Sequence, residues 1–186
     1  MQIISAENID FAYNGEKALD DINFKINESD FLTILGPNGS GKSTLLKILA
    51  RINELQSGSL IVNGHYIENY ESSQYAKFFS YVPCDIYTPY DFSVLEIVIM
   101  GRAPYLKWWE DYAKTDKAWA CEILENMRIS HLAERNINSL SSGEKQLVFI
   151  AQALVQNPRI LVLDEPTSHL DIKYKMEIFG LLDEMR

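Results

Sequence analysis

The feature that most constrains this chain is a glycine-rich run, Gly-Pro-Asn-Gly-Ser-Gly-Lys-Ser-Thr, at residues 36–44. It contains the phosphate-binding loop pattern, in which Gly36 is followed by four residues and then by Gly41, Lys42 and Ser43. The apolar residues 31–35 before it predict a strand, and residues 42–52 after it have a helical pattern. A chance glycine-rich turn would lack these flanks. The sequence therefore predicts a site for a nucleoside triphosphate.

Each residue type in this loop has a chemical reason to be there. Glycines let the backbone turn tightly enough for successive N–H groups to point at one phosphate, and the N-terminus of the helix adds partial positive charge. Lys42 is expected to reach the β- and γ-phosphates, and the Ser43 hydroxyl is expected to ligate Mg²⁺. The residues expected to hold the nucleotide here are Gly36, Pro37, Asn38, Gly39, Ser40, Gly41, Lys42, Ser43 and Thr44.

Composition limits the other possibilities. The 186 residues suffice for one domain with a core, and the formal net charge of −9 does not favour nucleic acid as a partner. No apolar run approaches the length of a membrane span, and the N-terminus has no signal-peptide pattern, so a cytosolic protein is expected. Cys84 and Cys121 have neither disulfide-framework nor zinc-site spacing.

The order of patterns predicts an α/β fold. Alternating segments with an Asn14-Gly15 turn between them predict an antiparallel β-subdomain, and residues 160–163 predict a buried parallel strand. The expected strands are residues 3–11, 22–26, 31–35, 58–64, 79–83 and 160–163. The expected helices are residues 42–52, 94–100, 116–127, 143–156 and 171–185.

Two acidic residues, Asp164 and Glu165, follow the last predicted strand. One carboxylate can support a magnesium shell, and its neighbour can polarise a water molecule in line with the γ-phosphate. We expect Asp164 to support the metal together with Ser43, and Glu165 to be the general base.

A third run, Leu-Ser-Ser-Gly-Glu-Lys-Gln at residues 140–146, has small residues before a predicted helix. Taken alone, it reads as a helix N-cap. Together with the phosphate loop and with Leu-Asp-Glu-Pro-Thr-Ser-His-Leu-Asp at 163–171, it resembles the ATP-binding-cassette (ABC) ATPases over nearly the whole chain.

The resemblance implies a single ABC ATPase domain over residues 1–186: a phosphate-loop NTPase core with a β-subdomain at 1–85 and 157–186, and an inserted helical subdomain at 86–156. It implies ATP and Mg²⁺ as cofactors. It also implies a head-to-tail dimer of two such subunits with ATP between them. The loop residues expected to contact the ATP of the partner subunit are Ser141, Ser142, Gly143 and Glu144.

Two further regions are assigned by the resemblance. Tyr13 stands where the family places an aromatic ring that stacks on adenine, although packing within the sheet is an alternative. Residues 168–171 would join the two ATP sites across the dimer.

A narrower resemblance lies in Met-Gly-Arg-Ala-Pro-Tyr at residues 100–105, which is similar to importers of iron–siderophore complexes, haem or cobalamin. It implies an ATP-hydrolysing importer subunit that associates with a membrane permease at the inner face of the cell membrane, and indirectly with a substrate-binding protein. Trp108 and Trp109 are candidates for the permease surface. A soluble ABC ATPase and an ATP-binding module with little turnover remain alternatives.

Three departures from the family pattern bear on activity. Cys84 replaces a glutamine that touches the magnesium shell, and a thiol is a poor ligand for Mg²⁺. Ser142 replaces a glycine. The family's switch histidine, roughly thirty residues beyond the catalytic glutamate, is absent because the sequence stops at Arg186; His169 is too close to replace it. We therefore expect a chain shortened at its C-terminus that lacks core strands.

Overall fold

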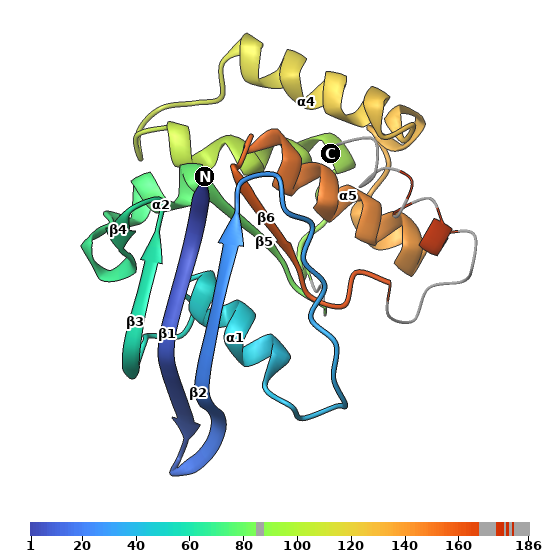
Figure 1. Ribbon diagram of the computed structural model, residues 1–186. Helices are drawn as coiled ribbons and strands as arrows, with labels where there is room; N and C mark the ends of the chain where they lie inside the picture. The colour runs from blue at the N-terminus through green and yellow to red at the C-terminus, as the bar shows by residue number, and fades with distance from the viewer. Residues whose placement is uncertain (85–87, 168–173, 177, 179, 181–186) are drawn as a thin grey trace. The chain divides into compact units, whose positions relative to one another are not determined.

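The structure is a computed structural model that describes residues 1–84, 88–167, 174–176, 178 and 180 (Figure 1). It divides into two compact units, Met1–Glu71 and Ser72–Met185. The predicted division into a core and an inserted helical subdomain at 86–156 stays a prediction, because compactness alone does not define a subdomain.

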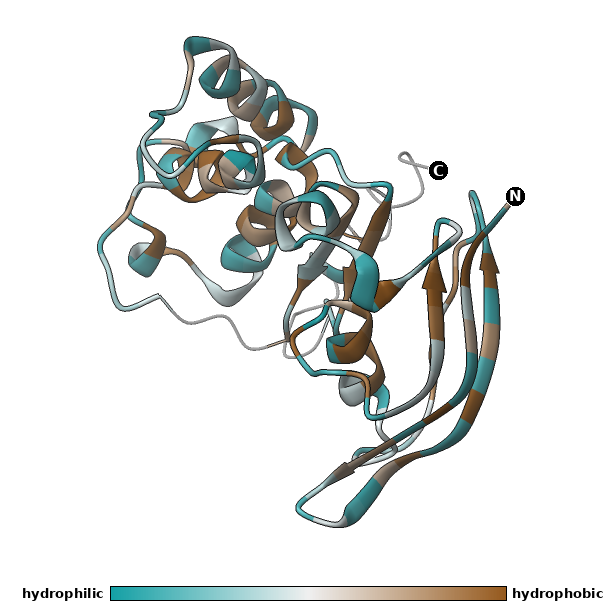
Figure 2. Ribbon diagram, turned by 90° about the vertical axis from the view of Figure 1, so that its left-hand side faces the viewer, coloured by the Kyte–Doolittle hydropathy of each residue, from teal (hydrophilic) through white to brown (hydrophobic). Residues whose placement is uncertain are grey.

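Unit 1 is built on an antiparallel sheet with the strand order β2-β1-β3-β4. Its strands are β1 (Gln2–Tyr13), β2 (Glu16–Asn27), β3 (Ser57–Val62) and β4 (His65–Tyr66), followed by the short helix η1 (Ile67–Asn69). Hydrophobic and hydrophilic residues alternate along the long strands, as a sheet with one covered face requires (Figure 2). Asn14 and Gly15 both have positive φ, 48° and 87°, so the predicted hairpin turn and antiparallel pairing are confirmed.

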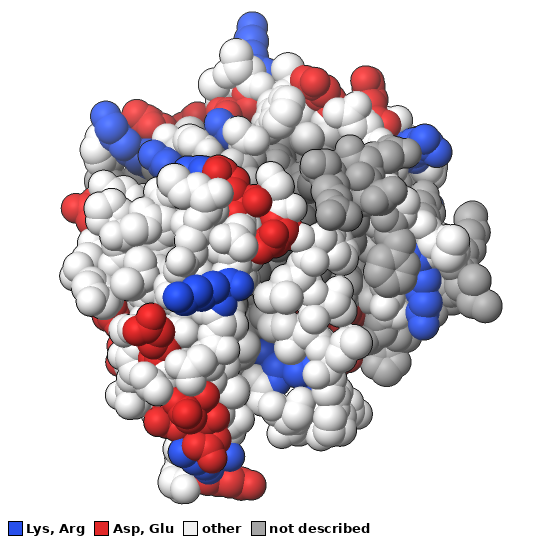
Figure 3. All heavy atoms as spheres, viewed as in Figure 1, with Lys and Arg blue, Asp and Glu red and all other residues white. Residues whose placement is uncertain are grey.

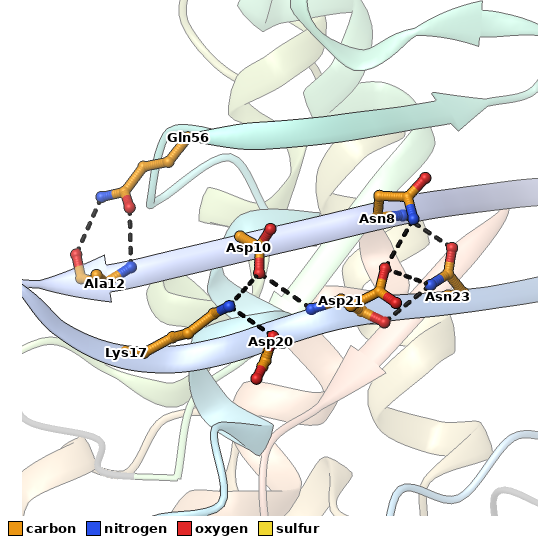
Figure 4. A network of polar contacts seen from close by, with 8 residues as sticks. All are labelled: Asn8, Asp10, Ala12, Lys17, Asp20, Asp21, Asn23 and Gln56. Atoms are coloured by element: carbon orange, nitrogen blue, oxygen red, sulfur yellow. Dashed lines mark hydrogen bonds and ion pairs between the residues drawn. The ribbon is translucent and has the colours of Figure 1, made fainter.

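A polar network holds the irregular part of the β1–β2 hairpin (Figure 4). The register of the pair shifts between Ala6 and Phe11, and Asn8 and Asp21 have φ of 52° and 49° there. The Asn8 Nδ2 donates to Asp21 Oδ1 at 2.7 Å, and Asp10 accepts from the Asp21 N–H at 3.0 Å. Figure 3 shows the charges at this end of the hairpin as a mixed acidic and basic cluster. These polar side chains therefore stabilise a bulged hairpin.

The segment between β2 and the phosphate loop differs from the prediction. The expected strand at 31–35 is wrong: within the described residues it belongs to no strand, and Phe31, Leu32 and Leu35 are 55%, 55% and 87% exposed. An apolar sequence becomes a strand only when a neighbour pairs with its N–H and C=O groups, and no such ladder is described here. The helix that follows is α1 (Lys42–Leu49), close to its predicted range.

Unit 2 contains a helical core and a two-stranded parallel sheet. The strands are β5 (Phe79–Val82) and β6 (Ile160–Leu163), in which Tyr81 pairs with Val162. The helices are α2 (Ser72–Phe78), α3 (Val94–Ile99), η2 (Met100–Tyr105), α4 (Lys114–Asn126), η3 (Ser130–Leu132), η4 (Ile137–Ser139) and α5 (Ser142–Val155).

The core of unit 2 lies among α3, α4 and α5. Val98, Leu124 and Leu147 are each at most 1% exposed, and they represent the apolar faces of the three helices. The predicted helices at 94–100, 116–127 and 143–156 are therefore confirmed within two residues at each end. Among the described residues, none of these helices is both long and apolar enough to cross a bilayer.

The parallel pairing of β6 is as predicted, but its burial is not. All four of its residues are half-buried, because β5 is the one strand paired with it among the described residues. The predicted helix at 171–185 lies largely outside the described residues; 174–176, 178 and 180 are helical.

Candidate functional site

The phosphate loop of unit 1 is an exposed turn that leads into α1. Ser40 N–H donates to the Pro37 carbonyl at 3.2 Å, which closes the turn. The Lys42 ammonium folds back over the loop and donates to the carbonyls of Gly36 and Pro37, each at 3.0 Å. These are contacts with weak neutral acceptors at the surface, so a phosphate oxygen is a stronger partner for the same ammonium.

Gly41 explains why the loop can enter the helix at this point. Its φ is 85°, and a Cβ built there would lie 2.4 Å from the Ala18 carbonyl oxygen, so a side chain is excluded both by the backbone and by the neighbouring strand. Gly41 is also the N-cap of α1 and has no side chain to cap the first-turn amides. These amides, with Lys42 beside them, form a site suited to an anion.

Tyr13 lies at the end of β1. Its ring is 46% exposed, packs edge-to-face against Phe11 at 4.8 Å between centroids, and its hydroxyl accepts from Asn53 Nδ2 at 2.8 Å. One edge of the ring thus packs within the unit while much of it remains exposed. The stacking role stays a prediction.

The acid pair of unit 2 follows β6, and its two residues have different environments. Asp164 is 4% exposed, its N–H donates to the Val82 carbonyl at 2.9 Å, and its Oδ2 accepts from the Tyr81 hydroxyl at 3.0 Å. Burial, and then this hydrogen bond to the carboxylate, raise the pKa of Tyr81 far above its ordinary value, so the tyrosine is the proton donor.

Glu165, by contrast, is exposed and has a φ of 47°. A non-glycine residue in the left-handed region is uncommon, and such residues are found more often at functional sites. The backbone turn after β6 thus directs two adjacent carboxylates into different surroundings: one is fixed and buried, and the other is open to solvent.

The predicted helix that carries the Ser-Ser-Gly-Glu run is capped at Ser141. The Ser141 Oγ accepts from the Glu144 N–H at 3.3 Å, and the Glu144 carboxylate accepts from the Ser141 N–H at 2.8 Å and from its hydroxyl at 2.7 Å. This is a complete capping box. The hydrogen bond from the Ser141 backbone, followed by the one from its side chain, lowers the pKa of Glu144.

Gly143 of the same run is buried under an aromatic ring. A Cβ built on Gly143 would lie 2.6 Å from atoms of the Tyr174 ring. Gln146, one turn further, is 7% exposed, and its Nε2 has no hydrogen-bond partner among the described residues. The structure thus adds a packing requirement for glycine at 143, beside the predicted phosphate contact that remains untested.

The Met-Gly-Arg-Ala-Pro-Tyr run forms η2 and closes the C-terminal end of α5. Arg102 Nη1 and Trp119 Nε1 donate to the Val155 carbonyl at 3.1 and 3.0 Å, and the Tyr105 hydroxyl donates to the Gln156 carbonyl at 2.9 Å. Arg102 also pairs with Asp116 at 3.0 Å and stacks on the Tyr105 ring at 3.9 Å. A cation and two further donors thus satisfy carbonyls that a helix end leaves unpaired.

The remaining predicted positions are placed as follows. Cys84 is half-buried just beyond β5, and Trp108 and Trp109 are 92% and 62% exposed. The loop 168–171, with His169, lies outside the described residues. The contact between Tyr81 and Asp164 was not predicted; it follows from the register of β5 on β6, for which the sequence gives no signal.

A phosphate-binding loop at the start of a helix, together with acidic residues at the end of a parallel strand, defines the phosphate-loop class of α/β nucleotide-binding proteins. The family model of the ABC transporter matches residues 19–168. The chain belongs to the ABC transporter family, and its fold is that of the ABC ATPases.

Three known proteins illustrate the relationship. The chain is 35% identical to the iron(3+)-hydroxamate import ATP-binding protein FhuC of Bacillus subtilis, over all of this chain and 69% of FhuC. An ABC transporter solved in an inward-facing conformation is 34% identical, with a TM-score of 0.86 over 99% of this chain and 68% of the other. The dimeric bacterial ABC transporter cassette MJ0796 is 28% identical, with a TM-score of 0.84 over 98% and 82%. Across three other similar relatives, the chain spans 63% to 71% of the relative's length.

Proposed function

We propose that this chain is the ATP-binding and ATP-hydrolysing subunit of an importer for an iron–siderophore complex or a related metal chelate. The phosphate loop carries the nucleotide part of the proposal, because its glycine conformations, the start of α1 without a side-chain cap, and the Lys42 ammonium over the loop suit a polyphosphate. Similarity to an iron(3+)-hydroxamate import protein supports the substrate class.

The residues expected at the metal fit Mg²⁺. Ser43 offers a hydroxyl oxygen at the start of α1, and Asp164 offers a carboxylate whose orientation is fixed by Tyr81. Mg²⁺ prefers such oxygen ligands and takes its remaining ligands from phosphates and water. Bound there with ATP, the ion would neutralise charge on the transferred phosphoryl group.

The chain's own groups divide the rest of the work. Lys42 and the first-turn amides of α1 bind and orient the phosphates, and Glu165 accepts the proton of the attacking water. Exposure of Glu165 is consistent with this role, since the base must reach a water molecule. Residues 141–144 are proposed to contact the ATP of a second subunit, which requires release of the capping box from Ser141.

Two copies of the chain are proposed to form a head-to-tail dimer, as the dimeric cassette among its structural neighbours suggests. A permease is proposed to hold the dimer at the inner face of the membrane, with a substrate-binding protein acting through that permease. Trp108 and Trp109 are exposed enough to take part in such a contact.

The direct test is steady-state release of phosphate from Mg-ATP, with Glu165→Gln as the matched control and a fluorescent ATP analogue to measure binding. We expect binding by both chains and turnover by the wild type alone. Turnover that is equal in both chains would contradict the role of Glu165.

Binding by both chains with turnover in neither would favour an ATP-binding module, the alternative motivated by Cys84. Co-purification with a membrane permease would separate an importer subunit from a soluble ABC ATPase.

A further inference from the structure

We propose that Tyr81 is a positioning residue for the magnesium-supporting carboxylate of Asp164, and that it makes nucleotide affinity depend on the metal. The inference rests on the proposed function, because it assigns a role within the same site. It starts from one contact, the hydrogen bond of 3.0 Å from the Tyr81 hydroxyl to Asp164 Oδ2.

The contact is set by the backbone of the parallel sheet. Tyr81 pairs with Val162 and Val82 pairs with Leu163, so the side chain of Tyr81 stands two positions before Asp164 in register. The ladder continues past the strand, since Asp164 N–H donates to the Val82 carbonyl at 2.9 Å. Tyr81 thus lies within β5, and Asp164, the first residue after β6, is held to β5 by this backbone hydrogen bond.

Burial makes this contact selective for one orientation of the carboxylate. Asp164 is 4% exposed and Tyr81 is half-buried, so solvent has little access to replace the phenol as donor. A carboxylate with one oxygen bound to a neighbouring donor has a fixed direction, and such donors hold metal ligands in place. Asp164 is thus pre-oriented before any metal arrives.

The same contact ties the metal-supporting residue to the end of β5. Cys84 follows two residues after Val82. A thiol is a poor ligand for Mg²⁺, so Cys84 is not expected to bind the metal, whereas Tyr81 donates a hydrogen bond to the carboxylate that is expected to support it. We therefore expect Tyr81 to link β5 to the metal through the carboxylate of Asp164.

The test measures the dissociation constant for a fluorescent ATP analogue in excess Mg²⁺ and again in EDTA. The quantity compared between variants is the dissociation constant in EDTA divided by the dissociation constant in Mg²⁺. Tyr81→Phe removes the hydroxyl and leaves the ring. We expect the ratio to fall about tenfold in this variant while the value in EDTA stays within about twofold, since loss of a ligand-orienting partner typically weakens metal binding by 10–100-fold. If Tyr81 had only a structural role, Tyr81→Phe would weaken binding in Mg²⁺ and in EDTA by the same factor, and the ratio would not change.

Four further variants test the same point. Tyr105→Phe removes a hydroxyl hydrogen bond of 2.9 Å from the same unit, and its ratio should equal that of the wild type. In an Asp164→Asn background, Tyr81→Phe should have no further effect on the ratio. The residue 4-aminophenylalanine at position 81 restores a donor and should restore the ratio. A thermal melt of each variant checks that it folds. The residue 4-methoxyphenylalanine at position 81 keeps the ring but cannot donate a hydrogen bond, so it should lower the ratio as Tyr81→Phe does.

The outcomes separate this inference from the proposed function. A wild type that binds no ATP analogue in either buffer overturns both. A wild type whose binding is the same with Mg²⁺ and EDTA, an unchanged ratio in Tyr81→Phe, or an equal loss in both buffers overturns the role of Tyr81 and leaves ATP binding standing.

Discussion

Gly101 of η2 offers a sharp test of the packing described for the end of α5. A Cβ built on this buried glycine would lie 2.1 Å from the Gln152 carbonyl oxygen and 2.5 Å from Val155 Cγ1. Ordinary contact between carbon and oxygen begins beyond 3 Å, so Gly101→Ala must move η2 away from α5 by roughly 1 Å, and the backbone atom that it meets cannot swing aside as a flexible side chain would.

The cost follows from what such a movement disturbs. Overpacking of a tight core costs about 1–3 kcal/mol, and the three hydrogen bonds from Arg102, Trp119 and Tyr105 to the end of α5 would lengthen, at up to about 1 kcal/mol each. We therefore expect Gly101→Ala to lower the free energy of unfolding by about 3 kcal/mol. For a chain of this size, that corresponds to a fall in Tm of about 6–12 °C.

The assay is urea unfolding followed by tryptophan fluorescence, with a thermal melt beside it. Gly180→Ala is the matched control, because Gly180 is helical and no atom of the described residues lies within 4 Å of its added Cβ. It should be neutral or stabilising by up to about 1 kcal/mol. A Gly101→Ala chain within about 0.5 kcal/mol of the wild type would refute the packing of η2 on α5.

Three other changes have defined outcomes. Lys42→Ala should weaken binding of the fluorescent ATP analogue by roughly 10–100-fold through loss of charge-assisted hydrogen bonds, while Tm moves by less than about 2 °C; an unchanged affinity would contradict the phosphate role. Arg102→Lys should cost about 1–3 kcal/mol in urea unfolding, because an ammonium cannot serve Asp116, Val155 and the Tyr105 ring together. The pKa of Glu144 is lowered in the folded chain, so its hydrogen bonds to Ser141 stabilise the fold above the ordinary value of 4.5 and lose this effect as the pH falls below it. The stability difference between wild type and Glu144→Gln should therefore shrink below about pH 4.5; a difference independent of pH would count against the capping box.

Much of unit 1 and of the helical core could be predicted from the sequence, because the signals are local. The Asn14-Gly15 turn, the alternating strands and the apolar period of residues 143–156 each depend on neighbours within a few residues. The start of α5 is also local, since a serine and a glutamate three residues apart are enough to form the capping box.

The errors concern partners that are distant in sequence. Residues 31–35 have the composition of a strand. A strand forms only when a neighbouring strand pairs with its backbone, and the local sequence pattern does not show whether such a neighbour is present. The hydrogen bond from Tyr81 to Asp164 spans 83 positions and depends on the register of two short strands. Likewise, Gly101 and Arg102 of η2 belong to a run that resembles an importer sequence. Their structural role, which is close packing on α5 and a hydrogen bond to the carbonyl of Val155 at its end, could not be predicted from the sequence.

The exposed run at residues 31–35 has a consequence for how the chain behaves during synthesis and purification. Phe-Leu-Thr-Ile-Leu contains no charge and no proline, and it combines high strand propensity with the exposure of four large apolar side chains. Segments of this kind are preferred starting points for intermolecular β-structure, and the single Asp30 before the run is a weak gatekeeper. Yield and solubility of this chain should therefore depend on protein concentration and on chaperone supply. Replacement of Leu35, which is 87% exposed, by a charged residue should improve both.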